Sequence, residues 1–182
     1  MANTPTERFD LLRQWLLRLV GIVLGHGGPL ASALQRTVQD REAVAELDGV
    51  VLQLRAEAAD GTLRVTIEPG PAAGPRQFRA TADALRDVIA GRALLDAAVV
   101  DGRIAVKAPL PDLLAMHDLA MRLLASGPQR ATLRELWAEF DASWPRGPVA
   151  CGPLHRQRPR HGRFRERVPL DVLLVRLDDA WR

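Results

Sequence analysis

The sequence of 182 residues has little of what secreted proteins and many enzymes rely on. It has one cysteine, Cys151, which excludes an internal disulfide framework and indicates a reducing compartment. None of its three serines lies in a Gly-x-Ser-x-Gly motif, and the sequence has no His-Glu-x-x-His motif, phosphate-binding loop or dinucleotide-binding glycine pattern. No apolar run approaches the ~20 residues of a membrane span, and the first residues show no signal-peptide pattern. We therefore expect a cytoplasmic protein.

The remaining candidates for catalysis or metal binding are weak. Cys151, His155 and His161 offer three zinc ligands, but a fourth ligand is missing. His117 lies on an apolar helix face, where a histidine is more often a packed side chain than a catalytic base. The stretch "GHGGP" (25–29) follows a helical pattern, so it predicts a helix end and not a phosphate site. We expect no catalytic residue, no metal site and no cofactor.

Positive charge is concentrated near the C-terminus. Residues 1–145 hold 16 basic and 18 acidic residues, whereas residues 146–182 hold 9 and 4. Residues 143–169 predict a basic linker rich in Pro, Gly and Arg, and residues 170–182 predict a short amphipathic helix. The linker is either simply solvated or a tether to an acidic protein or an anionic membrane. We expect no specific nucleic acid, because Phe164 is the single aromatic residue among the arginines of residues 146–169.

Residues 1–29 predict an N-terminal amphipathic helix. Within "ERFDLLRQWLLRLVGIVLGHGG" (7–28), apolar residues recur at steps of three and four, and the glycines and Pro29 end the pattern. Three surroundings for this helix stay open. It packs on its own domain, pairs with a second copy of the chain in a homo-oligomer, or lies on a membrane surface.

The middle of the chain mixes helical and strand patterns. Residues 30–47 predict a short helix or a pair of helices. "GVVLQLRAEAADGTLRVTIEPG" (49–70) alternates apolar and polar residues around Asp60-Gly61, which predicts an antiparallel hairpin with one face in water. A third short strand is expected at 76–81.

A helix capped by Thr81 is expected at 81–94, ended by Gly91. "DAAVVDGRIAV" (96–106) predicts a second hairpin, turned by Asp101-Gly102. Strands joined by tight turns, with helices collected on one side, indicate an α+β fold.

The helix predicted at 110–124 is apolar on two sides. One stripe contains Leu110, Leu113, Leu114, His117, Met121 and Leu124. The other contains Met116, Leu119 and Leu123. Either both stripes are ordinary core, with residues 132–140 covering the outer one, or one stripe faces a cavity.

Residues 78–125, "FRATADALRDVIAGRALLDAAVVDGRIAVKAPLPDLLAMHDLAMRLLA", resemble the second half of a sterol carrier protein type-two domain. The similarity lies in the order and length of a helix (84–91), a strand (102–106) and a leucine-rich closing helix (110–124), and it extends over roughly residues 30–125. Lys107-Ala108-Pro109 stands where the family commonly has Gly-Asp, so the mouth of a ligand tunnel is expected to differ.

The resemblance implies a domain at 30–142, in which helices cover a five-stranded, mainly antiparallel sheet and an apolar tunnel lies between sheet and helices. The implied function is non-enzymatic binding and carriage of an apolar lipid in a bacterial-type carrier. The alternative is an accessory or scaffold subunit that assembles with an enzyme, for example in lipid or quinone biosynthesis. The implied ligand-binding residues are Leu85, Val88, Ile89, Ile104, Val106, Leu113, Leu114, His117, Met121 and Leu124.

Overall fold

The computed structural model describes residues 4–59, 62–71, 74–126 and 130–146. The first part of this described chain contains α1 (Pro5–His26), α2 (Gly28–Val38), β1 (Arg41–Leu47), β2 (Val50–Ala59), β3 (Thr62–Pro69) and β4 (Gln77–Ala80). The second part contains α3 (Ala82–Ile89), α4 (Leu95–Val100), β5 (Ile104–Lys107), α5 (Leu110–Ser126) and α6 (Ala131–Ser143). Most of the predicted basic linker and all of the predicted terminal helix lie outside the described residues.

The five strands form one sheet in the order β3-β2-β1-β4-β5. β1 is central, pairing antiparallel with β2 and parallel with β4. The β2–β3 and β4–β5 pairs are antiparallel. The predicted α+β fold with a five-stranded, mainly antiparallel sheet is therefore confirmed, as is the hairpin that joins residues 50–59 to 62–69.

The two faces of the sheet differ in polarity. On the inner face Leu52 is fully buried, and Leu54 packs against the core. The outer face carries ion pairs between neighbouring strands, such as Arg79 with Glu46, whose Nε and Oε2 atoms are 2.7 Å apart. The prediction of one apolar and one wet face is confirmed.

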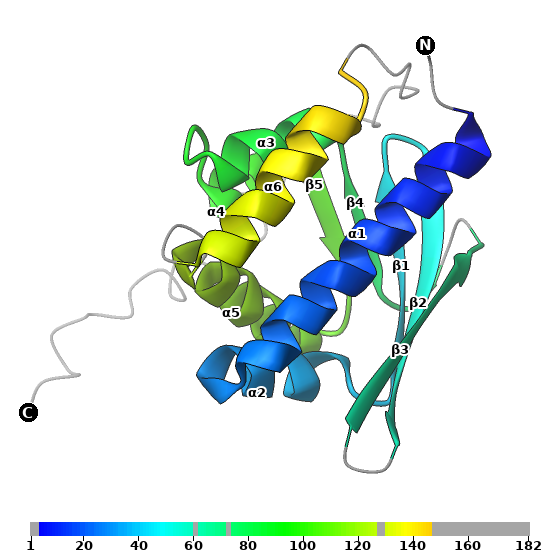
Figure 1. Cartoon of the computed structure of the whole chain (residues 1–182), viewed down its shortest axis with the longest axis vertical. Coiled ribbons are helices and arrows are strands. Elements are labelled where there is room, and N and C mark those ends of the chain that lie inside the picture. The colour runs from blue at the N-terminus through cyan, green and yellow to red at the C-terminus, as the bar shows by residue number, and fades with distance from the viewer. Residues whose placement is uncertain (1–3, 60–61, 72–73, 127–129, 147–182) are drawn as a thin grey trace, which may run out of the picture. The chain divides into compact units, whose positions relative to one another are not determined.

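Helix α1 packs on its own domain. A capping box begins it, in which the Thr4 hydroxyl accepts from the Glu7 amide at 3.3 Å and the Glu7 carboxylate accepts from the Thr4 amide at 2.7 Å. The helix runs diagonally in front of the strands in Figure 1, and contacts β2, β3, α2 and α6. Leu12 and Val23 are buried. Of the three surroundings that the sequence left open, the described residues place α1 on the protein's own core.

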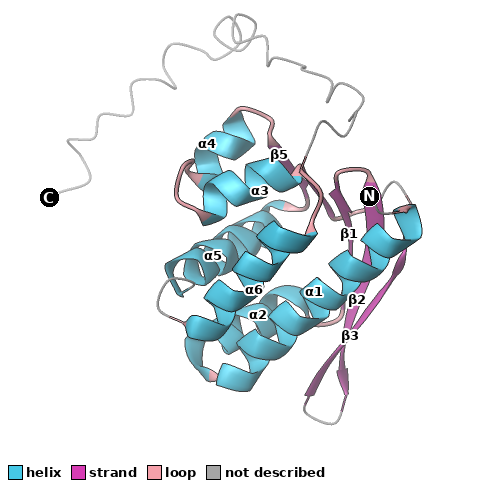
Figure 2. Cartoon of the chain, turned by 45° about the horizontal axis from the view of Figure 1, so that its top comes forward, coloured by secondary structure: helices cyan, strands magenta, loops and turns pink. Residues whose placement is uncertain are grey.

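The turned view in Figure 2 shows the helices gathered on one side of the strands. α5 packs against α2, while α6 packs against α1. The indole of Trp15 on α1 donates to the Leu136 carbonyl of α6 at 3.1 Å. The rings of Trp15 and Trp137 lie 5.0 Å apart, as do those of Trp15 and Phe140. α1 and α6 therefore form one aromatic layer above the sheet.

Two predicted elements are wrong. Residues 41–47 form the central strand β1 and not part of a helix. Asp40 adopts a positive φ of 55°, which ends the helical segment, and pairing on both edges overrides the helix preference of Ala and Glu in "REAVAEL".

Residues 95–100 form helix α4 and not the first strand of a hairpin. Gly102, with φ of 70°, ends this helix, because its amide bonds to the Val99 carbonyl at 3.0 Å and the next amide, of Arg103, bonds to the Ala98 carbonyl at 2.9 Å. Asp101-Gly102 is therefore a helix stop.

Asp48 joins three parts of the fold. With Gly49 it forms the two-residue turn between β1 and β2, both with positive φ (48° and 80°). Its buried carboxylate accepts from the Ala82 amide at 3.2 Å and from the Trp144 indole at 2.8 Å. The Arg8 guanidinium donates to its carbonyl at 3.0 Å. This turn therefore holds the start of α1, the start of α3 and the end of α6 together.

Candidate functional site

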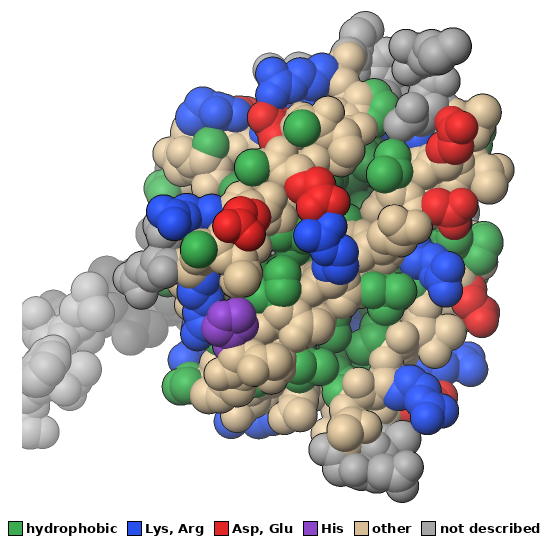
Figure 3. Space-filling view, viewed as in Figure 1, with side chains coloured by type: hydrophobic (Ala, Val, Ile, Leu, Met, Phe, Trp, Pro, Cys, Tyr) green, Lys and Arg blue, Asp and Glu red, His purple; other side chains and the backbone are tan. Residues whose placement is uncertain are grey.

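Two apolar cavities lie between the inner face of the sheet and the helices. We call the first the aromatic cavity; it has a volume of about 260 Å³ and is lined from β1, β2, β4, β5, α1, α3, α4, α5 and α6. We call the second the arginine cavity; it has about 310 Å³ and is lined from β1, β2, β3, α1, α2 and α5. Over the helical side of the molecule, hydrophobic side chains lie among scattered charged ones (Figure 3).

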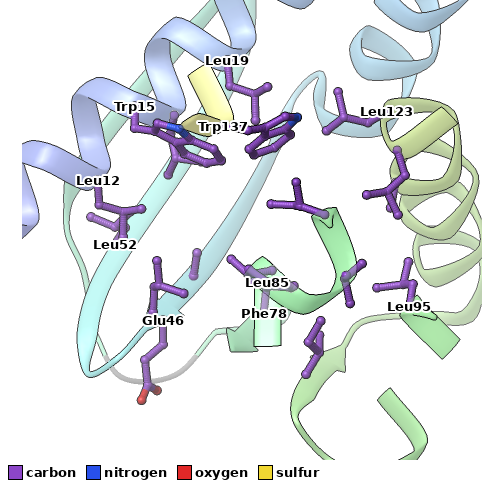
Figure 4. A pocket seen from close by; sticks show the side chains of 18 residues that line it. Leu12, Trp15, Leu19, Glu46, Leu52, Phe78, Leu85, Leu95, Leu123 and Trp137 are labelled. Atoms are coloured by element: carbon purple, nitrogen blue, oxygen red, sulfur yellow. The ribbon is translucent and has the colours of Figure 1, made fainter. Parts of the chain in front are cut away.

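The aromatic cavity is closed by the α1–α6 layer. Trp15 and Trp137 point toward it from one side, and Phe78 and Leu85 from the sheet and α3 (Figure 4). All four side chains are half-buried, and three of them, Trp15, Phe78 and Leu85, pack against the core while part of their surface faces the cavity.

Among the described residues, no charged side chain enters the aromatic cavity. Glu46 contributes to its lining, but its carboxylate points away from the other side chains in Figure 4 and pairs with Arg79 on the outer face of the sheet. The rest of the lining is aliphatic or aromatic. Such a surface favours an alkyl or isoprenoid chain.

The arginine cavity has a polar end. Its apolar part includes Leu34, Val65, Met116 and Leu119. Its polar lining residues are Thr37, whose hydroxyl donates to the Ala33 carbonyl at 2.8 Å, and two arginines, Arg41 and Arg76.

Both arginines bind Asp112 in the first turn of α5. The Arg41 Nη1 atom lies 2.7 Å from one carboxylate oxygen, and the Arg76 Nε atom lies 2.6 Å from the other. The Asp112 side chain is 8% exposed, so this cluster is largely shielded from water. It fixes the two guanidinium groups at one end of the arginine cavity.

Helix α5 borders both cavities. Ala120 and Leu123 line both of them, and Met116 and Leu119 line the arginine cavity. The second predicted stripe therefore faces the cavities. Much of the first stripe faces solvent, since Leu110 is 68%, Leu114 64% and Met121 46% exposed. Helix α6 does not cover it, because α6 packs on α1.

The ten residues implied by the resemblance fall into two groups. Those that line the aromatic cavity are Leu85, Val88, Ile89, Ile104 and Leu124. Those that line neither cavity are Val106 and Leu113, which are half-buried, and Leu114, His117 and Met121, which are exposed. His117 lies 3.0 Å from Asp96 of α4 through its Nε2 atom. Contact of any of the ten with a ligand stays a prediction.

Sequence reasoning did not find several lining residues. Trp15 and Trp137 belong to helices whose amphipathic patterns the sequence shows. The apolar face of each pattern could have predicted that these two side chains point inward. Arg41 and Arg76 carried no signal, because one lay in an expected helix and the other at the edge of a short strand. Their pairing with Asp112 depends on the tertiary fold.

Two carboxylates outside the cavities have lowered pKa values. Hydrogen bonds from Arg103 and Arg92 lower the pKa of Asp87, and a hydrogen bond from Arg122 lowers that of Asp118. Within the described ranges, no three His, Cys, Asp or Glu side chains are grouped to hold a metal ion. The same residues include no helix with the length and apolarity to cross a membrane.

No family model and no curated protein matches the chain. Several solved chains are similar to it, including the following two. One is the ubiquinone synthesis protein UbiJ-SCP2, with 17% identity, coverage of 61% of this chain and 89% of that chain, and a TM-score of 0.43. The other is a solution structure from Thermus thermophilus, described as possibly a sterol carrier protein, with 15% identity, coverage of 58% and 76%, and a TM-score of 0.36.

Proposed function

We propose that this protein binds a lipid non-covalently in the two cavities and carries it without chemical change. The observation that supports this proposal is the pair of cavities, of about 260 and 310 Å³, beside a shared apolar wall. Protein interiors are packed with few voids larger than a water molecule. Two spaces of this size, with so little polar lining, suit an apolar ligand better than water.

Burial of the ligand supplies the driving force. Each methylene moved from water into the cavities contributes about 0.8 kcal/mol. The half-buried side chains of Trp15, Phe78 and Leu85 lose their remaining accessible surface at the same time. Apart from Glu46, Thr37 and the two arginines, the lining side chains are aliphatic or aromatic, and no nucleophile–base pair stands among them. The proposed role is therefore carriage.

The test is to look for the ligand directly. Full-length protein purified from its own host is extracted with organic solvent, and the extract is analysed by mass spectrometry. We expect a lipid near one equivalent per chain, and displacement of a fluorescent fatty acid by that lipid. Protein that yields no lipid and binds no fluorescent fatty acid would contradict the proposal.

A second candidate function is an accessory subunit that assembles with an enzyme. The observation that favours it is an exposed apolar surface on α4, α5 and the residue before α4, which we call the α4–α5 surface. The contact between His117 and Asp96 links the two helices at one point. Its members are Leu94, Val99, Val100, Leu110, Leu114 and Met121. Exposed apolar patches commonly mark protein interfaces.

This candidate is tested with the double variant Leu110→Ser and Leu114→Ser. If the surface holds an enzyme, native purification from the host recovers that enzyme with the parent and loses it with the double variant. The matched control is Ala125→Ser, which changes an exposed residue on the same helix. Equal recovery with all three proteins would contradict an interface on the α4–α5 surface. Tethering through the basic C-terminal residues stays a prediction, since those residues lie outside the described ranges.

A further inference from the structure

We propose that the arginine cavity holds the anionic head group of an amphiphile, a carboxylate or a phosphate, against Arg41 and Arg76, while the hydrocarbon chain extends into the aromatic cavity. This inference rests on the proposed function and narrows it from lipids in general to lipids with an oxyanion head.

Charge balance at the polar end is the first observation. Two guanidinium groups share a single carboxylate, with Arg41 2.7 Å from one Asp112 oxygen and Arg76 2.6 Å from the other. Among the nearby carboxylates, Glu42 pairs with Arg55, and Asp40 accepts from the Ala58 amide at 3.4 Å. The cluster of Arg41, Arg76 and Asp112 by itself therefore carries one net positive charge.

The position of the charges is the second observation. Both arginines line the arginine cavity, whereas Asp112 does not. The side chains of Arg41 and Arg76 are 33% and 26% exposed, so most of their surface is withdrawn from water. A cation beside an apolar space is costly unless an anion pairs with it. A ligand oxyanion supplies that partner.

Free donors are the third observation. Arg76 donates to Asp112 through Nε, and in the described part of the chain its two Nη atoms have no protein acceptor. Arg41 uses Nη1 for Asp112 and for the Thr37 carbonyl at 2.9 Å, which leaves its Nε and Nη2 atoms. Guanidinium groups bind carboxylate and phosphate oxygens in a fork, and such charge-assisted hydrogen bonds are stronger than neutral ones.

The shared wall sets the direction of the chain. Ala120 and Leu123 line both cavities, and beyond them the aromatic cavity has no charged side chain pointing into it. Desolvation disfavours an anionic group there and favours hydrocarbon. We therefore place the anionic head group at the two arginines and the hydrocarbon chain near Trp15 and Trp137.

The experiment compares hexadecanoic acid, hexadecyl phosphate and hexadecanol on the full-length protein, by displacement of a fluorescent fatty acid at pH 8. We expect the two anions to bind about tenfold more tightly than the alcohol, the effect of roughly one net charge-assisted hydrogen bond. Inorganic phosphate alone, at millimolar concentration, separates a free-ion site from a head-group site. We expect it to displace nothing, and displacement by phosphate alone would overturn the assignment to an amphiphile.

The variant Arg76→Met removes one positive charge from the cluster and leaves Arg41 and Asp112 as a neutral ion pair. We expect it to bind acid and alcohol equally, and Arg76→Lys to restore most of the preference. Arg79→Met is the matched control, because Arg79 pairs with Glu46 on the outer face of the sheet. It should keep the full preference for the acid.

A second measurement uses the unaltered protein, so that misfolding of a variant leaves the inference testable. Carbon-13 NMR of carboxyl-labelled hexadecanoic acid should show the bound carboxyl titrating well below the same acid in a micelle. An unshifted titration, or equal binding of acid and alcohol by the parent, would overturn this inference and leave lipid binding intact. Failure of all three ligands to bind would overturn the proposed function as well.

Discussion

The aromatic cavity and the arginine cavity differ in chemistry more than in size. Their volumes are about 260 and 310 Å³, and they share Ala120 and Leu123 as a wall. One is closed by aromatic rings from α1 and α6, the other by α2, the central strand and two arginines. Size alone would let a lipid lie in either direction. The difference in charge is what gives the pair of cavities an orientation.

The largest effect is expected from a change in the shared wall. Ala120→Trp places a bulky ring at a residue that lines both cavities, so it should block both. We expect binding of a fluorescent fatty acid to weaken by more than about tenfold, which is a loss of binding free energy above about 1.4 kcal/mol. Circular dichroism checks that the fold survives.

Ala125→Trp is the control on the same helix, since residue 125 is exposed. Leu114→Trp and Met121→Trp serve the same purpose, because both side chains are exposed and line neither cavity. Binding that falls with these three and persists with Ala120→Trp would show that the ligand lies on the α4–α5 surface and not in the cavities.

The next effect concerns the carboxylate at the polar end. Asp112→Asn leaves two guanidinium groups without an anion, and we expect the free energy of unfolding to fall by about 1–3 kcal/mol. Urea titration measures the change. Hexadecanoic acid should stabilise this variant more than it stabilises the parent, because the ligand then supplies the missing charge.

The control for Asp112 is Asp118→Asn, on the same helix. Asp118 pairs with Arg122 at 2.8 Å, but both side chains are about half exposed, at 54% and 46%. Surface pairs of this kind contribute little to stability. A loss at Asp118 as large as at Asp112 would show that the buried cluster has no special role.

A smaller effect tests the direction of the bound chain. Trp15 and Trp137 lie at the aromatic cavity. Fatty acids brominated near the methyl end should therefore quench tryptophan fluorescence more than those brominated near the carboxyl end, in a protein carrying Trp181→Phe to remove the tail indole. The reverse gradient would place the head group in the aromatic cavity.

The smallest effect is at Asp87 on α3. Hydrogen bonds from Arg103 and then Arg92 lower the pKa of this carboxyl in the folded protein. Its contribution to stability is therefore present above the ordinary pKa of about 4 and is lost as the pH falls through the lowered value. Asp87→Asn should be slightly less stable than the parent at pH 7. The difference should disappear in acid, as measured by thermal unfolding at several pH values.

Three Asp-Gly pairs show how far the sequence predicted the fold. The pair at 60–61 was expected to turn a hairpin, and the strands on either side of it do pair, although the turn itself lies outside the described residues. The pair at 101–102 ends a helix, and the pair at 48–49, which went unrecognised, turns the hairpin of the central strand. Asp-Gly supplies a positive φ in each of these two cases. The segment before each Asp-Gly pair decides whether the pair ends a helix or turns a hairpin. The two segments concerned, "LDAAVV" and "REAVAEL", are each compatible with helix and with strand.

The part of the candidate site that lies on a single helix could be predicted from the sequence. The two apolar stripes of α5 were visible in the sequence, but which stripe faces inward depends on α2 and α6. In one of the two alternatives, residues 132–140 covered the outer stripe, but helix α6 packs on α1. The arginine cavity was not predictable, because Arg41, Arg76 and Asp112 come from three separate segments that only the folded chain brings together.

The bonds of Asp48 also determine when during synthesis the protein becomes competent. The β1–β2 hairpin is local and forms quickly, whereas the parallel pairing of β1 with β4 and the bond from Asp48 to Trp144 span long stretches of chain. A ribosome-bound chain that has not yet released Trp137 lacks part of the outer wall of the aromatic cavity. On the proposed function, lipid capture therefore follows emergence of α6 from the exit tunnel.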